Sequence, residues 1–257
     1  MILRVEGKLM QRDALTRELD RLLQPERFRD YSPNGLQVQG RAEIHRVVTG
    51  VSASLALIDA ALAVNADAIL VHHGWFWRGE DPRLLGFRRE RMARLLAADL
   101  NLYAYHLPLD AHAQLGNNAG LARVLGFTET GRCGEQDLLC HGSNEAAGNL
   151  GDLAARVTRC LGRAPLIIGD PARPVSRVAW CTGAAQSLFE TALNLGVDVF
   201  LSGEISEQHV HLARESGVAY LACGHHATER FGVQSLAAWL TSETGVTAQF
   251  IDIDSPV

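Results

Sequence analysis

Histidine and carboxylate side chains occur in this sequence in an order that can bind metal ions. The set consists of one His-His dipeptide and two histidines that each precede a carboxylate by four residues: His72, His73, His106, Asp110, His225 and Glu229. Imidazole and carboxylate groups together suit zinc, iron or manganese, and a carboxylate can bridge two such ions. A single histidine–carboxylate pair is more often a structural hydrogen bond. Two such pairs together with the dipeptide favour a metal site.

Each candidate histidine follows a short apolar run that is typical of a buried β-strand. The runs comprise residues 68–71, 102–105 and 220–224. Open α/β sheets bind their ligands at the carboxyl ends of such strands, so we expect the candidate side chains to gather there. Neighbouring residues of a strand point to opposite faces, but the chain turns where a strand ends. Both His72 and His73 can therefore be ligands.

The second half of the sequence repeats the first. Residues 198–201 (Asp-Val-Phe-Leu) correspond to residues 67–70 (Asp-Ala-Ile-Leu), and the two histidine–carboxylate pairs occupy matching positions. On this alignment Gly203-Glu204 falls opposite the His-His dipeptide. Because each half reads as strand, helix and strand, the sequence predicts an α/β fold of two similar halves with the metal site between them.

We expect the first α/β half at residues 1–126 and the second at residues 178–257, together forming one compact unit. Residues 127–177 are expected to be a connecting region of helix and irregular structure. Within it, the stretch 134–149 is rich in Gly, Asn and acidic residues and predicts turns, whereas residues 152–161 predict a helix.

The residues that precede the first repeat predict one helix and one turn. Residues 11–23 place leucines on one face among charged residues, which is typical of an amphipathic helix. Residues 31–35 contain Pro33-Asn34-Gly35, and this combination predicts a turn.

Composition narrows the classes of protein to consider. The chain has 257 residues, of which 47% are hydrophobic and 21% charged, enough to bury a globular core. No apolar run approaches the length of a membrane span, and the N-terminus is charged, so we expect neither a membrane segment nor a signal peptide. The five cysteines form no C-x-x-C pair, which argues against a disulfide framework or a thiolate zinc cluster. We therefore expect a cytoplasmic protein. Lys8 is the only lysine, which excludes Schiff-base and Walker-type phosphate sites. A net charge of -5 argues against general binding to nucleic acids.

Two other groups of residues leave alternatives open. Five arginines crowd one segment, where they form either a solvated helix face or a phosphate-binding patch: Arg83, Arg88, Arg89, Arg91 and Arg94. His209 and His211 lie two apart in a helical stretch and point in different directions, so a packing or surface role is favoured. His112 lies near the candidate site in sequence and remains ambiguous.

Four motifs of this sequence closely resemble the GTP cyclohydrolase 1 type 2 homologue family, also called Nif-three-like proteins, in its short bacterial form. They occur in the family's order across nearly the whole chain: Pro33-Asn34-Gly35-Leu36-Gln37-Val38, Val71-His72-His73-Gly74, His106-Leu107-Pro108-Leu109-Asp110-Ala111-His112 and Gly224-His225-His226-Ala227-Thr228-Glu229. His-His-Gly, His-x-x-x-Asp and Gly-His-x-x-x-Glu at successive strand ends rarely coincide by chance.

The resemblance implies two divalent metal ions per chain, of iron, zinc or manganese, with His106 beside them. The ligands it implies are His72, His73, Asp110, His225 and Glu229. It also implies a fold of two similar α/β halves and a toroidal homohexamer whose metal sites face an internal cavity. The name of the family implies opening of the guanine imidazole ring of GTP.

The sequence therefore favours a dinuclear-metal-dependent hydrolase that acts on a purine nucleotide or a related ring amide. Two metal ions generate hydroxide near neutral pH, and His106 or His226 can pass a proton to the leaving nitrogen. A metal-dependent phosphoesterase would use the same groups. A non-enzymatic protein that stores or delivers metal, or serves as a scaffold, is the other alternative, and its site would lose metal readily to a mild chelator.

The family resemblance predicts that the purified protein forms a closed ring of six chains. We expect light scattering at micromolar concentration to give the mass of a hexamer. A stable monomer under these conditions would contradict the ring and, with it, the enclosed metal site.

Overall fold

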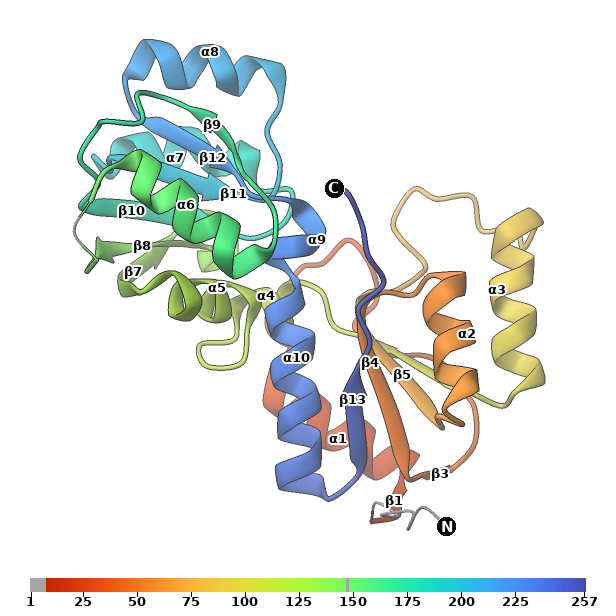
Figure 1. Ribbon diagram of the computed structural model, residues 1–257. Helices are drawn as coiled ribbons and strands as arrows, with labels where there is room; N and C mark the ends of the chain where they lie inside the picture. Colours follow the sequence, from red (N-terminus) through yellow and green to blue (C-terminus); the bar gives the residue numbers. More distant parts are fainter. Residues whose placement is uncertain (1–7, 147) are drawn as a thin grey trace. The chain divides into compact units, whose positions relative to one another are not determined.

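The chain folds into two units, each built around one main sheet whose central strands are the apolar runs of the sequence (Figure 1). The computed structural model describes residues 8–146 and 148–257. Unit 1 comprises Met1–Leu109 and Gly232–Asp254, and unit 2 comprises Asp110–Phe231 and Ser255–Val257. The chain thus passes between the units three times, directly before Asp110, directly after Phe231 and directly before Ser255.

Unit 1 contains a five-stranded sheet whose middle strands are parallel. From one edge to the other its strands are β13 (Thr247–Phe250), β4 (Arg46–Ser52), β5 (Ala68–His73), β6 (Asn101–Ala104) and β2 (Gly35–Val38). β13 pairs in parallel with β4, whereas β2 pairs antiparallel with β6. The short strands β1 (Met10–Gln11) and β3 (Glu43–Ile44) form a separate antiparallel pair.

Helices cover both faces of this sheet (Figure 1). One face packs on α2 (Leu55–Ala63) and α3 (Gly86–Ala97), and the other on α1 (Arg12–Leu23) and α10 (Arg230–Trp239). On the second face the Tyr103 hydroxyl lies 3.1 Å from Thr16 Oγ1 of α1, and Thr49 Oγ1 donates a hydrogen bond to the Val233 carbonyl of α10. Strands covered on both sides are apolar throughout, which explains why their runs stand out in the sequence.

Unit 2 contains a six-stranded mixed sheet. Its order is β7 (Phe127–Cys133), β8 (Leu139–Asn144), β10 (Arg177–Cys181), β11 (Val199–Ser202), β12 (Ala219–Ala222) and β9 (Leu166–Ile168). The three strands β10, β11 and β12 are parallel, and β7, β8 and β9 are antiparallel to their neighbours.

The helices of unit 2 also lie on both faces of their sheet. One core cluster joins the sheet to α5 (Asn117–Leu125) and α6 (Leu150–Leu161), and another joins it to α7 (Phe189–Asn194) and α8 (Glu207–Ser216). Two short helices, α4 (Leu107–Ala111) and α9 (His225–Thr228), carry candidate site residues. None of the helices in the described part of the chain is long and apolar enough to cross a membrane.

The internal repeat appears directly in the strand topology. In unit 1 the parallel order β4-β5-β6 is followed by an antiparallel edge strand, and in unit 2 the parallel order β10-β11-β12 is followed by another. The aligned aspartates also have the same role. Asp67 Oδ2 accepts hydrogen bonds from two successive backbone N–H groups at the start of β4, and Asp198 Oδ2 does the same at the start of β10.

The units do not follow the boundaries expected at residues 126 and 177. Residues 127–177 contain three strands and the helix α6, and β8 occupies part of the stretch 134–149 in which turns were expected. β7 and β8 carry polar residues such as Thr128, Glu129 and Ser143, because strands with one solvated face need no continuous apolar run. Residues 232–254 return to unit 1, since β13 pairs with β4, and no local pattern reveals such a distant pairing.

The paired aspartates predict a difference in stability between two matched variants. Asp67→Ala leaves two backbone donors without their acceptor at a site where the side chain is 10% exposed, so we expect a loss of about 1–3 kcal/mol in the free energy of unfolding. Asp198→Ala should cost less, because water reaches its 29% exposed side chain. Urea unfolding measures both, with the exposed Asp254→Ala as the control. Equal losses for all three variants would contradict this role.

Candidate metal centre

Unit 1 brings three of the candidate histidines together at the ends of β5 and β6. Ligand nitrogens of His72, His73 and His106 lie within 4.8 Å of one another. The ring centroids are separated by 4.6 Å between His72 and His73 and by 5.0 Å between His72 and His106. We refer to these three residues as the histidine cluster.

β5 continues through both residues of the dipeptide, whereas the sequence favoured a strand that ends before them. His72 is fully buried and His73 is partly buried. The next residue, Gly74, runs so close to β6 that a Cβ atom there would lie 2.4 Å from the Cβ atom of Ala104. Only glycine fits this approach, which gives the third position of the His-His-Gly motif a steric cause.

The Nδ1 atoms of His72 and His73 have fixed partners. His72 Nδ1 lies 3.1 Å from the backbone carbonyl oxygen of Tyr105, and His73 Nδ1 lies 3.1 Å from the Ser52 hydroxyl. Because a carbonyl oxygen only accepts hydrogen bonds, His72 carries its proton on Nδ1 and its lone pair on Nε2. Metal-binding histidines are commonly oriented by a hydrogen bond of this kind at the other ring nitrogen.

His106 is oriented by a carboxylate from the segment before β2. Asp30 Oδ1 accepts a hydrogen bond from His106 Nδ1 at 2.7 Å, and Asp30 Oδ2 accepts one from the Leu107 backbone N–H at 3.0 Å. Asn34 links the two residues: its amide donates to Asp30 at 2.9 Å, and its oxygen accepts the backbone N–H of His106 at 2.7 Å. The Pro-Asn-Gly turn therefore supports the ring of His106.

Asp30 is ionised at neutral pH despite its burial. Burial opposes its charged form, but the hydrogen bond and charge of His106, with hydrogen bonds from Asn34 and the Tyr31 backbone, together lower the pKa of Asp30 to about 2. A carboxylate at this position keeps a proton on His106 Nδ1. The lone pair of the neutral ring then lies on Nε2, as it does in His72.

Unit 2 brings together the two candidate carboxylates and the fourth histidine. Carboxylate oxygens of Asp110 and Glu229 lie within 4.8 Å of one another, and His225 Nε2 lies 3.1 Å from Glu229 Oε2. Asp110 and Glu229 are both buried, with 6% and 2% of their surfaces exposed. We refer to Asp110, His225 and Glu229 as the carboxylate cluster.

Glu204 orients His225 as Asp30 orients His106. Its Oε1 atom accepts a hydrogen bond from His225 Nδ1 at 2.7 Å. Burial opposes the charge of His225, but the two carboxylates at its ring nitrogens, Glu229 and Glu204, outweigh burial and raise the pKa of His225 to about 9. The imidazolium form thus balances part of the negative charge in this cluster.

Neighbouring residues fix the two carboxylates in place. Asp110 Oδ1 accepts hydrogen bonds from the Asn117 amide at 2.8 Å and from the Thr182 hydroxyl at 3.1 Å. Gly183 has a positive φ of 69°, and a Cβ atom there would lie 2.0 Å from Glu229 Oε1. A glycine at this position therefore provides the space that the Glu229 carboxylate occupies.

The remaining histidines differ from the cluster members. His226 follows His225 in α9, where its backbone N–H bonds to the Val257 carbonyl, and its proposed catalytic role stays a prediction. His112 accepts two backbone N–H groups at Nδ1, and burial and Arg132 lower its pKa, so its ring acts as a local cap. His209 is buried against the Phe189 ring and His211 is exposed, in agreement with packing and surface roles.

Sequence reasoning did not identify the residues that orient the imidazoles. Asp30 and Ser52 give no signal, because neither spacing nor the repeat links them to the histidines. Glu204 had a signal, since the repeat alignment places it opposite the His-His dipeptide. Asn34 lies in a motif that was interpreted as a turn and as part of the family resemblance, without a role at the histidines.

The donor set fits divalent metal ions. Four imidazoles are held at Nδ1 by separate partners, and two buried carboxylates lie close together in the carboxylate cluster. Mixed imidazole and carboxylate donors suit zinc, iron or manganese. The contacts of His106 with Asp30 and of His225 with Glu204 are alike, and the two histidines occupy matching positions of the repeat.

Comparison with known proteins places these residues in a family context. A model of the family described as Duf34/NIF3 (NGG1p interacting factor 3) matches residues 10–256. A relative from Neisseria meningitidis, named GTP cyclohydrolase 1 type 2 homolog, is 50% identical over 248 residues, covering 96% of this chain and 99% of its own. An Escherichia coli relative of the same name is 47% identical, covering 96% of this chain and 100% of its own.

A solved structure shows the same fold. The structure titled protein ybgI, of unknown function, superimposes with a TM-score of 0.93 at 46% sequence identity. The match covers 96% of this chain and 100% of that one. The similarity therefore extends over both units.

The orienting carboxylate Glu204 predicts a loss of metal affinity without direct removal of a ligand. Glu204→Gln keeps the size of the side chain but weakens its hold on the imidazole of His225, so we expect metal affinity to fall about 10–100-fold. Asp30→Asn weakens the hold on His106, which lies outside the proposed ligand set, and should leave metal affinity unchanged. Competition with a chelating dye measures the affinity, with the exposed Glu207→Gln as the control. Unaltered affinity in Glu204→Gln would refute its orienting role.

Proposed function

The chain belongs to the Duf34/NIF3 family, and we propose that it is a dinuclear-metal-dependent hydrolase. We propose further that its substrate is a purine nucleotide or a related ring amide. The names of the curated relatives, GTP cyclohydrolase 1 type 2 homolog, support this choice of substrate class.

The observation that carries the proposal is the closeness of two buried carboxylates. Asp110 and Glu229 place oxygens within 4.8 Å of one another, in surroundings where like charges repel strongly. The charge of His225 offsets only part of this repulsion. Divalent cations would offset the rest, which is why buried carboxylates are commonly paired or bound to metals.

The proposed ligands are the five residues that the family pattern indicates: His72, His73, Asp110, His225 and Glu229. His72 and His225 would bind through Nε2, because their Nδ1 atoms are held by the Tyr105 carbonyl and by Glu204. Bound metal ions would supply a hydroxide near neutral pH and polarise the bond under attack.

His106 is the proposed proton carrier of the reaction. Asp30 accepts a hydrogen bond from His106 Nδ1 and so fixes the ring with Nε2 available to accept a proton and then donate it to a leaving nitrogen. This arrangement fixes the ring and its tautomer, as a carboxylate does for other catalytic histidines. His226 is the second proposed carrier and follows a candidate ligand directly in sequence.

The direct test uses protein stripped of metal with a chelator and then reloaded with zinc, iron or manganese. We expect the reloaded protein to hydrolyse GTP and the stripped protein to be inactive. His106→Asn should abolish turnover while keeping metal content. Hydrolysis of phosphodiesters in place of GTP would support a phosphoesterase. Loss of metal to a mild chelator, without any turnover, would support metal delivery instead.

Glu229→Gln separates a ligand from a structural residue. The substitution keeps the size of the side chain but removes a charge that offsets two divalent ions, so metal content should fall from close to two ions per chain. The melting temperature of the metal-free protein should change little, because repulsion from Asp110 is removed at the same time. Metal analysis and thermal unfolding of the stripped protein measure the two effects.

His211→Ala is the control for this comparison, because His211 is exposed. The nearby His209 is less suitable as a control, because its side chain is buried and its removal could itself lower stability. The control should change neither metal content nor melting temperature. A Glu229→Gln variant that binds metal normally but loses stability in the metal-free state would show that Glu229 only anchors the fold.

A further inference from the structure

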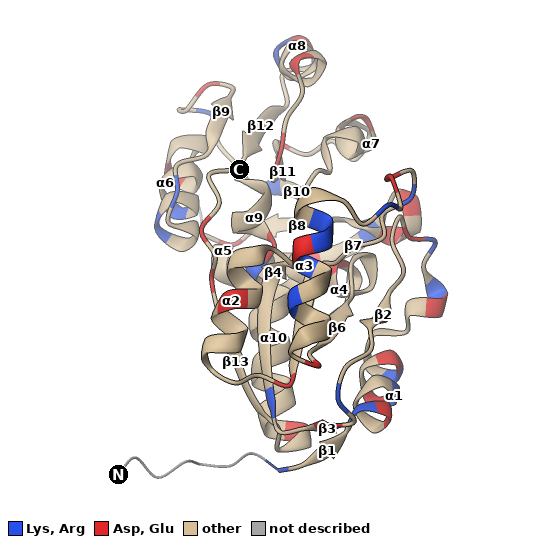
Figure 2. Ribbon diagram, turned by 90° about the vertical axis from the view of Figure 1, so that its right-hand side faces the viewer, with Lys and Arg blue, Asp and Glu red and all other residues tan. Residues whose placement is uncertain are grey.

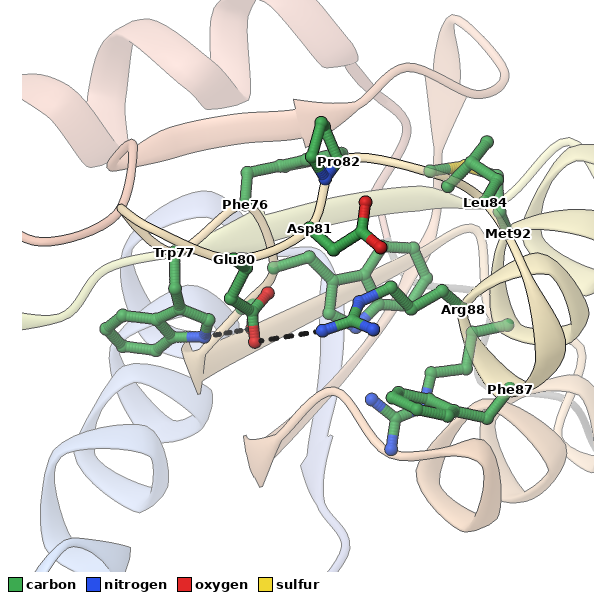
Figure 3. A pocket seen from close by; sticks show the side chains of 12 residues that line it. Phe76, Trp77, Glu80, Asp81, Pro82, Leu84, Phe87, Arg88 and Met92 are labelled. Atoms are coloured by element: carbon green, nitrogen blue, oxygen red, sulfur yellow. Dashed lines mark hydrogen bonds and ion pairs between the residues drawn. The ribbon is translucent and has the colours of Figure 1, made fainter.

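A cavity of about 250 Å³ lies in unit 1 between the segment that follows the His-His-Gly motif and the helix α3 (Figure 3). Four aromatic side chains line it, Trp75, Phe76, Trp77 and Phe87, together with the arginines Arg88 and Arg91 and the acidic residues Glu80 and Asp81. Several of these apolar side chains face solvent: Phe76 is 47% exposed and Phe87 is 56% exposed. We refer to this cavity as the aromatic pocket.

Most arginines of the sequence cluster have acidic partners. Figure 2 shows basic and acidic residues together on and near α3. The ion pairs join Arg83 to Asp81 at 2.6 Å, Arg88 to Glu80 at 3.5 Å, and Arg94 to Asp59 and Glu90. For Arg83, Arg88 and Arg94, the ion pairs agree with the interpretation of the cluster as a solvated helix face. Both acidic residues that line the pocket, Glu80 and Asp81, are included in them.

Arg91 differs from the three paired arginines and, because it is partly buried, also from the exposed Arg89. Within residues 8–146 and 148–257, its buried Nε atom has no hydrogen-bond partner and no carboxylate forms an ion pair with it. Its guanidinium carbon lies 5.1 Å from the centre of the Phe87 ring, beside that of Arg88 at 4.9 Å. A guanidinium stays charged when partly buried, so one that lines a pocket and has no carboxylate partner suits an anionic group.

The pocket lies next to the histidine cluster. Trp77 lines the pocket, and its ring meets His106 edge-on with 5.0 Å between ring centroids. The indole N–H of Trp77 donates to the carbonyl of Gly74, the residue that follows His73. A molecule bound in the pocket would therefore lie beside the imidazoles that the proposed reaction uses.

We infer that the aromatic pocket binds the base and phosphate of a purine nucleotide, with the ring against the tryptophan and phenylalanine side chains and the phosphate on Arg91. Aromatic rings stack with nucleobases of any type, and a guanidinium can bind two phosphate oxygens at once. The cavity is at the small end of ligand pockets, which favours one ring system with one anionic group over a larger ligand. The choice of a purine rests on the proposed function, whereas the need for a planar anion follows from the pocket itself.

The test is calorimetric titration of the full-length, metal-stripped protein, so that its result does not depend on metal or turnover. GMP, guanosine and ribose 5-phosphate are the probes. We expect GMP to bind at least tenfold more tightly than either guanosine, which lacks the phosphate, or ribose 5-phosphate, which lacks the base. Arg91→Gln should weaken GMP about tenfold or more and leave guanosine unchanged, and Phe87→Ala should weaken both.

Arg94→Gln is the matched control, since Arg94 lies one turn along the same helix and is already paired with acidic residues. It should not change the affinity for GMP. Arg91→Lys keeps the charge and should give intermediate affinity, which protects the test if Arg91→Gln does not fold. Thermal unfolding of each variant checks folding.

Three results would overturn the inference. The first is no measurable binding of GMP to the wild-type protein. The second is equal weakening by Arg91→Gln and Arg94→Gln, which would indicate general attraction to basic residues. The third is a change of oligomeric state in Phe87→Ala with no change in GMP affinity, which would assign this surface to a second copy of the chain. GMP binding by the stripped protein, together with no hydrolysis of GTP by the metal-loaded protein, would refute the proposed function alone.

Discussion

The orientation of imidazole rings through their Nδ1 atoms is the constraint on which the candidate centre depends. In proteins, a hydrogen bond at the second ring nitrogen fixes the tautomer and direction of an imidazole and thereby improves its binding of metal or its transfer of a proton. His72 obtains this from the Tyr105 carbonyl, His106 from Asp30 and His225 from Glu204. These arrangements in turn constrain residues that have no chemical role themselves. Asn34 hydrogen-bonds to both Asp30 and His106, and position 74 has no space for a Cβ atom.

The repeat provides this arrangement twice, with different electrostatic results. In both units a histidine follows the third parallel strand and has a carboxylate at Nδ1. In unit 1 the neighbouring strand end adds two imidazoles, and the cluster contains imidazoles only. In unit 2 the corresponding strand end supplies Glu204, and the cluster is anionic. One strand topology thus supports an imidazole-rich set and a carboxylate-rich set.

The two halves also differ in the connection that follows the matching strand end. Residues 74–100 join β5 to β6, whereas the shorter stretch 203–218 joins β11 to β12. The longer connection carries the aromatic side chains and the arginines of α3, and it forms a cavity beside the histidine cluster. Connections between parallel strands can differ in length without changing the sheet. Each connection crosses one face of the sheet and returns the chain to the start of the next strand.

The sequence by itself determined the parallel strands, the helix at residues 11–23, the repeat and the candidate ligands, because buried strands need continuous apolar runs and metals need particular donor types. It did not determine that residues 127–177 belong to the second sheet or that β13 joins the first, since polar edge strands lack a strong pattern and their partners lie far away in the chain. Tertiary structure alone decided which groups hold the imidazoles, because Asp30 reaches His106 from a distant turn. It also decided which arginine of the cluster differs from the others. Folding brings acidic partners to Arg83, Arg88 and Arg94, and it leaves Arg89 exposed but partly buries Arg91.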